Sequence, residues 1–171
     1  IAKMLAQGDI ATQTIQILEG WNLRDIGFYL EHRGIAQAEE FWEVAGFPGV
    51  EYKESPDLPQ PKNYSLQFPI LTTKPDTVGL EGFLFPDTYT FKRGESLEHM
   101  VLTMLGEMQE RFPVHKQKNA FEILTIASLL EKEVQTEEDK KMVAGILENR
   151  LAIGMPLQID ASVVYIVGIS N

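Results

Sequence analysis

The segment ILTIASLLEKEV at residues 123–134, followed by DKKMVAGILENRLAIGMPLQID at residues 139–160, decides the fold expected for the second half of the chain. Apolar residues recur at helical spacing in both segments, which predicts one helix from Asn119 or Ala120 to about Val134 and another from Asp139 to about Ile153. At about 100° per residue, the first helix carries a single apolar stripe. The stripe consists of Ile123, Ile126, Ala127, Leu130 and Val134.

Two carboxylates, Glu131 and Glu133, stand at the end of the first predicted helix. Each lies about 80° from the centre of the apolar stripe, so periodicity does not choose between them. The negative end of the helix dipole raises the pKa of a carboxyl group placed there. A carboxyl that stays protonated near neutral pH is what a general acid for sugar or ester cleavage requires. The alternative is a solvated Glu-Lys-Glu helix end, and the residues taken alone favour it.

Composition excludes several classes of protein. The 171 residues include 25 acids and 15 bases, for a net charge of −10, and 44% are hydrophobic. This balance argues against a phosphate-binding nucleic-acid protein and against adsorption to an anionic membrane. No apolar run is long enough to span a bilayer. With no cysteine and three scattered histidines, we expect no disulfide, no metal and no cofactor.

The first half of the chain predicts a small module followed by a proline-rich stretch. A strand is expected at 15–17, a helix at 23–32 between an Asn22 cap and Gly34, and a short helix at 38–45 closed by Gly46. This module occupies residues 1–47. Six prolines between 48 and 79 predict a linker or extended loop. From residue 80 onward we expect a strand near Thr90–Phe91 and a helix that begins at Ser96, with an apolar stripe from Met100 to Met108.

Four segments, in this order and spacing, closely resemble the MltG (YceG-like) endolytic murein transglycosylases: LEGFLFPDTYTF at 80–91, IASLLEKEV at 126–134, DKKMVAGILENRLAIGMPLQID at 139–160 and SVVY at 162–165. The resemblance implies an α+β fold, with a small LysM-like strand and helix subdomain at 1–47, a linker at 48–79 and a mainly helical, lysozyme-like catalytic subdomain at 80–171. It also implies an outward-facing enzyme of the bacterial inner membrane, which acts on peptidoglycan strands alongside penicillin-binding proteins. No nucleic-acid partner is expected.

The same resemblance implies an endolytic reaction that cleaves the β-1,4 bond between N-acetylmuramic acid and N-acetylglucosamine and leaves a 1,6-anhydromuramoyl end. One acid is enough, because it protonates the leaving oxygen and then serves as base while the C6 hydroxyl of the sugar attacks. In the family this acid is the second glutamate of the Glu-X-Glu pair. It falls on Glu133, and Glu131 becomes a supporting or structural carboxylate.

Four further residues match positions that support the site in the family: Glu81, Gln158, Asp160 and Tyr165. Two of these residues could have a purely structural role instead. Glu81 could hold a loop backbone, and Asp160 could cap a helix. The chain departs from the family pattern at Ile159 and Ala161. It begins without Met and ends inside an apolar run, before the last segments of the family's catalytic domain. We therefore expect a piece of a longer protein that lacks its N-terminal membrane anchor and part of its glycan cleft.

Two other functions fit the sequence. The LysM-like part could hold glycan while the rest of the chain is inactive. Alternatively, the chain could be a structural domain whose Glu-Lys-Glu is only a solvated helix end. If Glu133 is the acid, we expect it at the floor of a groove, partly buried, near apolar walls and a polar donor.

Overall fold

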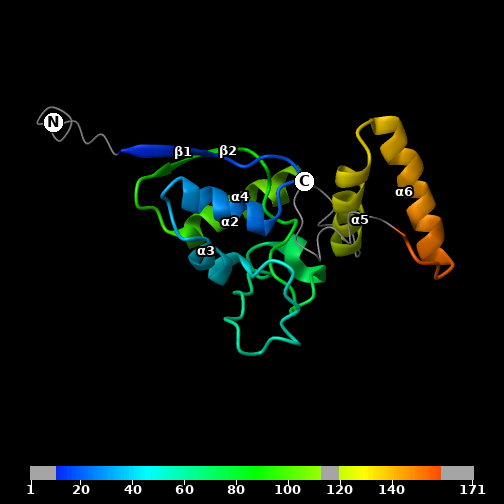
Figure 1. The fold of residues 1–171 in the computed structure, drawn as a ribbon, viewed down its shortest axis with the longest axis horizontal. Coiled ribbons are helices and arrows are strands. Elements are labelled where there is room, and N and C mark those ends of the chain that lie inside the picture. The colour runs from blue at the N-terminus through cyan, green and yellow to red at the C-terminus, as the bar shows by residue number, and fades with distance from the viewer. Residues whose placement is uncertain (1–10, 113–119, 159–171) are drawn as a thin grey trace, which may run out of the picture.

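The computed structural model describes residues 11–112 and 120–158. In these residues a two-stranded antiparallel sheet joins five α-helices and a short 3-10 helix (Figure 1), which confirms the predicted mixed, mostly helical α+β class. The elements in chain order are β1 (Thr12–Gln16), α2 (Leu23–His32), α3 (Ala38–Ala45), η1 (Pro69–Thr73), β2 (Thr88–Lys92), α4 (Leu97–Arg111), α5 (Ala120–Glu133) and α6 (Glu137–Ala152).

The sheet joins two strands that are far apart in sequence. β1 pairs with β2 in a register that sets Thr12 opposite Lys92 and Gln16 opposite Thr88. Residues alternate between the two faces of a strand, so Ile15 and its partner Tyr89 point into the core while their neighbours face solvent. Along the chain, α2, α3 and the proline-rich stretch lie between the two paired strands.

Local capping signals produce the helix ends that the sequence predicts. Asn22 and Asp25 form a reciprocal capping box at the start of α2, and Gly34 ends that helix in a left-handed conformation with φ of 65°. The Ser96 hydroxyl accepts a hydrogen bond from the His99 amide at the start of α4. These ends orient α2 and α4 against the sheet.

One hydrophobic core lies between the sheet, α2, α3 and α4. The predicted stripe of α4 is buried throughout, and so are the aromatic residues Phe83 and Tyr89 that precede and begin β2. The fully buried large side chains are Ile15, Leu23, Leu30, Phe41, Ile70, Leu80, Phe83, Met100, Val101, Met104 and Leu105. Members from before residue 47, from 48–79 and from after residue 80 therefore share one core.

Two close approaches in this core require glycine. A Cβ on Gly27 of α2 would lie 2.5 Å from Trp42 Nε1 of α3, and one on Gly46 would lie 2.5 Å from the Cα of Gly79. Trp42 Nε1 also donates a 2.8 Å hydrogen bond to the Leu23 carbonyl. The absent side chain at Gly27 lets α2 and α3 pack closely enough for this bond to form.

The proline-rich stretch packs against the core. Tyr52, Tyr64, Ile70 and Leu71 are buried, and the last two belong to η1. The division into 1–47, 48–79 and 80–171 remains a prediction, but the sheet and the shared core now connect all three ranges. Any unit built around β1 must include β2 from beyond residue 80.

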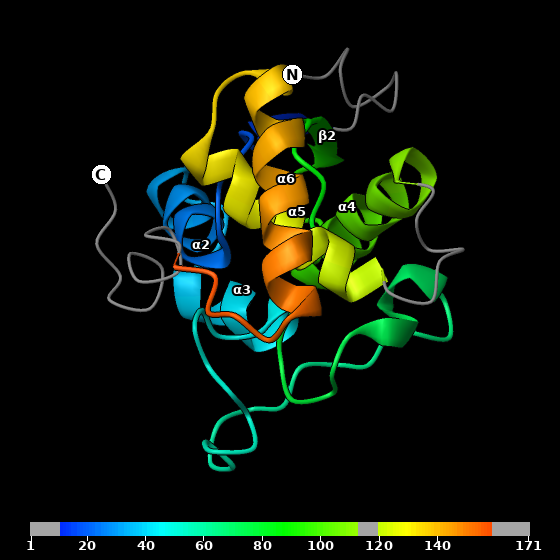
Figure 2. The same cartoon turned by 90° about the vertical axis from the view of Figure 1, so that its right-hand side faces the viewer.

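α5 and α6 lie on the outer side of this body, and Figure 2 shows α6 in front of α5. The Phe121 amide donates to Thr73 Oγ1 at 3.0 Å, and the Phe121 ring stacks on Phe83 with centroids 6.4 Å apart. These contacts attach the start of α5 to η1 and the core. Within residues 11–112 and 120–158, no helix has the length and apolar composition needed to cross a bilayer.

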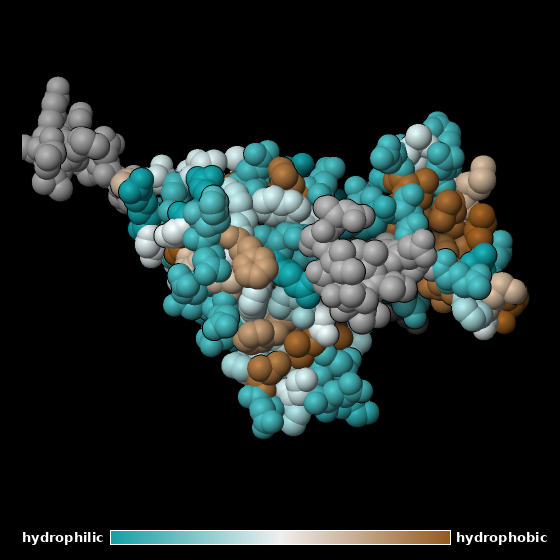
Figure 3. Space-filling model, in the orientation of Figure 1, coloured by the Kyte–Doolittle hydropathy of each residue, from teal (hydrophilic) through white to brown (hydrophobic). Residues whose placement is uncertain are grey.

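Two expectations for α5 and α6 need correction. α6 begins at Glu137, because Thr136 caps it and Asp139 lies inside its first turn. The described residues also cover the predicted apolar stripe of α5 only in part, because Leu130 alone is buried and Ile123, Ile126 and Val134 are half-buried. The surface of this helix pair accordingly carries a hydrophobic patch (Figure 3), with exposed Met142, Ile146, Leu151, Ile153 and Met155.

Candidate active site

Glu133 is the last residue of α5. Its side chain is exposed in the described part of the chain. The described residues do not supply the partial burial expected of a general acid, and Asp160 and Tyr165, two of the predicted site residues, lie outside them.

The carboxylate of Glu131 takes part in the packing of α5 against α6. Glu131 Oε2 accepts a hydrogen bond from Lys140 Nζ at 2.9 Å, which forms an ion pair between α5 and α6. This bond raises the pKa of the Lys140 ammonium, and the charges of Glu131, Glu137 and Glu19 add to the effect. Glu131 therefore contributes a partly exposed ion pair between the two helices.

The loop between β1 and α2 lies beside this end of α5. A Cβ on Gly20 would lie 3.6 Å from Lys132 Nζ, the residue between the two glutamates. The charge of Glu19, also in this loop, acts on Lys140 of α6. The end of α5 is thus brought close to residues from the first twenty of the chain.

Glu81 lies at the start of α2. Both oxygens of its carboxylate accept from the Leu23 amide, each at 3.2 Å. The amide groups at a helix N-terminus lack partners within the helix, and a carboxylate there also meets the positive end of the dipole. Glu81 thus contacts the backbone at the start of α2, and its assignment as a site-supporting residue stays a prediction.

The Gly-Met-Pro turn after α6 is fixed to the helix it follows. The Met155 amide donates to the Arg150 carbonyl at 2.8 Å, Gly154 donates to Leu151 at 3.1 Å, and Gly154 has a φ of 66°. Arg150 Nη1 in turn donates to the Leu157 carbonyl at 2.5 Å. These bonds form a Schellman-type end.

Gln158, the last residue that the structure describes, is exposed and has a φ of 54°. That φ lies in the left-handed region, which is uncommon for a residue other than glycine. The structure therefore places one of the three predicted site residues from this segment. Asp160 and Tyr165 lie outside the described residues.

Sequence reasoning missed two features of this region. Lys140 is nine residues from Glu131 and lies inside a charged run, so no spacing rule singles it out. A groove between β1 and α2 involves Trp21, Tyr29 and Arg33, which the helical pattern treats as ordinary surface residues. Among the described residues, no cluster of histidine, aspartate and glutamate could hold a metal ion.

Comparison with known proteins bears on the whole chain. The YceG-like family matches residues 1–171. The chain belongs to this family. A YceG-like protein of Listeria monocytogenes with a known crystal structure has a similar fold, with a TM-score of 0.66 at 28% sequence identity. That match covers 99% of this chain and 57% of the Listeria chain.

Two curated relatives carry an activity in their names. The endolytic murein transglycosylase of Streptococcus pneumoniae (strain ATCC BAA-255 / R6) is 42% identical over 95 residues, which are 52% of this chain and 17% of that protein. The endolytic murein transglycosylase of Bacillus subtilis (strain 168) is 35% identical over 96 residues, which are 52% of this chain and 27% of that protein. The matched segment is thus a minor part of each relative.

Proposed function

We propose that this protein is an endolytic peptidoglycan lytic transglycosylase. The observation that carries the proposal is membership of the YceG-like family across the whole chain, together with relatives named endolytic murein transglycosylase at 42% and 35% identity. The substrate is then a peptidoglycan strand. The bond cleaved is the β-1,4 linkage from N-acetylmuramic acid to N-acetylglucosamine.

Glu133 is the proposed acid and base. As a carboxylic acid it donates its proton to the leaving glycosidic oxygen, and as a carboxylate it takes the proton of the C6 hydroxyl that closes the 1,6-anhydro ring. Glu133 ends α5, two residues after Glu131, whose carboxylate pairs with Lys140 of α6.

The remaining predicted residues would build the cleft around Glu133. Gln158, Asp160 and Tyr165 would contact the substrate or orient the acid, and Glu81 would act through α2, whose first turn it holds. The order of strand, two helices and strand in β1, α2, α3 and β2 supports a LysM-like subdomain. In the whole protein, a membrane anchor would hold these parts outside the bacterial inner membrane, near penicillin-binding proteins.

Digestion of purified sacculi by the full-length protein tests the reaction type. Mass spectrometry of the released muropeptides should show 1,6-anhydromuramoyl ends. These are lighter than hydrolysed ends by one water molecule (~18 Da), because no water is added. Reducing ends in their place would show hydrolysis and overturn the proposed mechanism.

A second candidate is a non-catalytic peptidoglycan-binding or structural part of a cell-wall protein. The exposure of Glu133 in the described residues is the observation that favours it. Retained binding to sacculi with no released product, from the full-length protein, would select this candidate.

A further inference from the structure

The first turn of α5 is attached to the body of the protein, which is formed by the sheet, α2, α3, α4 and η1 around the shared core. Ala120 is 1% exposed, and Phe121 and Leu124 pack against that core. Among the described elements, α5 packs most closely against α6 and η1. α6 follows α5 along the chain and shares the ion pair of Glu131 and Lys140 with it. The contacts with η1 and the core therefore decide how this pair of helices sits on the body.

Thr73, the last residue of η1, caps α5 from outside that helix. Its Oγ1 accepts a 3.0 Å hydrogen bond from the Phe121 amide, which lies 48 residues further along the chain. The first amide groups of a helix have no partner within it, and a hydroxyl that accepts from one of them stabilises the helix end. Such a cap usually comes from the residue just before the helix. Because this one comes from η1, it also fixes where α5 starts relative to η1.

The backbone that carries Thr73 is itself held in place. Leu71 of η1 is buried in the core, and its carbonyl accepts from the Lys74 amide at 3.1 Å. Lys74 Nζ donates to the Pro75 carbonyl at 2.8 Å and to the Val78 carbonyl at 2.6 Å. These bonds close the chain directly after η1, so the Thr73 hydroxyl is presented to α5 from a fixed position.

Phe83 contacts the same residue of α5. Its ring is 1% exposed and stacks on the Phe121 ring, with centroids 6.4 Å apart and planes at 10°. Aromatic pairs at this separation stabilise a contact beyond the area that they bury. Two residues earlier, Glu81 accepts from the Leu23 amide at the first turn of α2. The segment at 81–83 therefore contacts the first turns of both α2 and α5.

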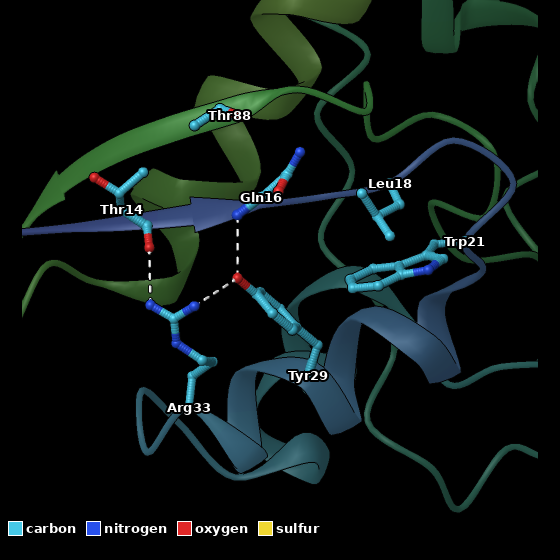
Figure 4. Close-up of a pocket in the computed structure, with 7 residues that line it drawn as sticks. All are labelled: Thr14, Gln16, Leu18, Trp21, Tyr29, Arg33 and Thr88. Atoms are coloured by element: carbon cyan, nitrogen blue, oxygen red, sulfur yellow. Dashed lines mark hydrogen bonds between the residues drawn. The ribbon is translucent and has the colours of Figure 1, made fainter.

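The far end of α5 meets the body through a softer contact. The turn from Leu18 to Trp21 (Figure 4) contains Gly20 and is closed by a 3.3 Å hydrogen bond from the Trp21 amide to the Leu18 carbonyl. A Cβ on Gly20 would lie 3.6 Å from Lys132 Nζ, which is the tip of a long, flexible side chain. The contact at the first turn includes a hydrogen bond of fixed geometry. It is the stiffer of these two contacts.

Glu133 is the last residue of α5, so a small rotation at the first turn becomes a large displacement at the candidate acid. α5 has 14 residues, and at roughly 1.5 Å per residue it is about 20 Å long. For a helix of that length, a tilt of about 5° moves the far end by about 2 Å. A misplacement of ~1 Å, caused by a change far from the chemistry, can cost about 100-fold in rate.

We propose that Thr73 and Phe83 are positioning residues for Glu133, which they place through the first turn of α5. Neither side chain needs to contact the substrate. The proposal rests on the proposed function, because it takes Glu133 as the acid, whereas the attachment of α5 rests on the contacts of Thr73 and Phe83 alone. It also gives the segment at 81–83 a role, which is to hold α2 and α5 in one frame.

Steady-state cleavage of soluble, uncrosslinked peptidoglycan strands by the full-length protein tests the proposal. Thr73→Val keeps the branched shape of the side chain and removes the acceptor, and Thr73→Ser keeps the hydroxyl. We expect Thr73→Val to lower kcat about 5- to 30-fold with KM within about two-fold of the wild type, because substrate binding is unchanged and the acid is misplaced in the transition state. Thr73→Ser should restore most of kcat.

Thr72→Val is the matched control. The Thr72 hydroxyl is next to Thr73 in the chain, is exposed, and donates to the Pro69 carbonyl within η1 at 2.7 Å. Its loss should leave kcat as in the wild type. Phe83→Leu keeps an apolar side chain in the core but removes the stack on Phe121, so it should lower kcat in the same way as Thr73→Val. Circular dichroism shows whether each variant is folded at the assay temperature.

A distance measurement tests the attachment of α5 without any reaction. Nitroxide labels at two exposed positions, Glu31→Cys of α2 and Ser128→Cys of α5, report the separation of α5 from the body by pulsed electron paramagnetic resonance. The 171 residues contribute no native cysteine to the labelling. Thr73→Val should broaden the distance distribution, and Thr72→Val should leave it unchanged.

A Thr73→Val protein that matches Thr72→Val in kcat, or in its distance distribution, would overturn the proposal. So would a Thr73→Ser protein as slow as Thr73→Val. Failure of the proposed function looks different, because the wild type would then release no anhydromuramoyl ends, or Glu133→Gln would stay active. The positioning of an acid would fall in that case, and the distance distributions would still decide whether Thr73 attaches α5.

Discussion

At the scale of single residues, the two glutamates of α5 show what sequence can and cannot determine. Helical periodicity places Glu131 and Glu133 at the two edges of the apolar stripe of α5, at equal angles from its centre, and so does not choose between them. The ion pair of Glu131 with Lys140 lies between two helices, so its formation depends on how α5 and α6 pack. The resemblance to a family chose Glu133, and that choice stays a prediction.

Gly27 offers a prediction about packing. Gly27→Ala should lower the free energy of unfolding by about 1–3 kcal/mol, since the added methyl group would collide with the Trp42 indole. The clash outweighs the gain of roughly 0.5–1 kcal/mol that alanine normally brings to a helix. Urea unfolding followed by circular dichroism measures the change.

The matched control is Gly145→Ala in α6, where a Cβ would meet no described atom within 4 Å. That substitution should raise stability by roughly 0.5–1 kcal/mol through helix propensity alone. A Gly27→Ala protein as stable as Gly145→Ala would mean that α2 and α3 are not packed this closely.

At the scale of elements, the sequence predicted where helices end, but it did not always predict whether the apolar face of a helix is buried. Asn22, Gly34 and Ser96 act within a few residues of themselves, so their caps can be predicted from local sequence. The stripe of α4 is buried as expected because α3 and the shared core pack against it. The stripe of α5 has the same pattern, yet its burial depends on what packs there, and the described residues cover most of it only in part.

The proline-rich stretch is joined to α4 by a cluster that predicts a pH effect. Lys62 donates to the Glu98 carboxylate at 2.9 Å, and Tyr64 Oη donates to it at 3.2 Å. The hydrogen bond from Lys62, aided by its charge and by Tyr64, lowers the pKa of Glu98. A carboxyl group with a lowered folded-state pKa stabilises the protein above its unfolded pKa of about 4.3, and the stabilisation is lost as pH falls through the folded value.

We therefore expect the melting temperature to fall more steeply from pH 5 to pH 3 in the wild type than in Glu98→Gln. Thermal unfolding at a series of pH values measures the two slopes. Glu110→Gln, an exposed position near the other end of α4, should keep the wild-type slope. Identical slopes for the wild type and Glu98→Gln would contradict the coupling.

The same cluster acts in the opposite direction at alkaline pH. Burial, followed by the charge and hydrogen bond of Glu98, raises the pKa of Tyr64 to about 12. A group whose folded pKa is raised stabilises the fold below its unfolded pKa, near 10 for tyrosine, and that contribution is lost as pH rises toward 12. Burial also raises the pKa of Tyr52 and of Tyr89. Several tyrosines should accordingly ionise late in an ultraviolet titration of the wild type, and Tyr64→Phe should remove one of them.

At the scale of the whole molecule, the pairing of β1 with β2 was beyond sequence reasoning. Each strand is short and has a recognisable alternating pattern, but about seventy residues separate them and no local signal identifies the partner. The prolines of 48–79 suggested a linker, whereas Tyr52, Tyr64, Ile70 and Leu71 are apolar or aromatic residues that bury against the shared core. Which surface they would meet depends on the sheet pairing.

This arrangement predicts the behaviour of a nicked chain. A protease site inserted between Asp57 and Leu58, next to exposed residues of the proline-rich stretch, should be cut without dissociation of the two pieces. The pieces should elute together in native size-exclusion chromatography, because β1 and β2 belong to different pieces and share one sheet and core. Elution of an independent N-terminal piece would show that residues 1–47 fold alone.

The central claim is that Glu133 is the acid and Glu131 is structural, and one comparison tests it most directly. Purified sacculi are incubated with full-length wild-type protein, with Glu133→Gln or with Glu131→Gln. Mass spectrometry quantifies the anhydromuramoyl products. We predict at least a 100-fold loss in Glu133→Gln, as expected for removal of a general acid (~10²–10⁴-fold). Glu131→Gln should retain most of the activity and show a small fall in melting temperature from the weakened bond to Lys140. Full activity in Glu133→Gln, or abolished activity confined to Glu131→Gln, would contradict the assignment.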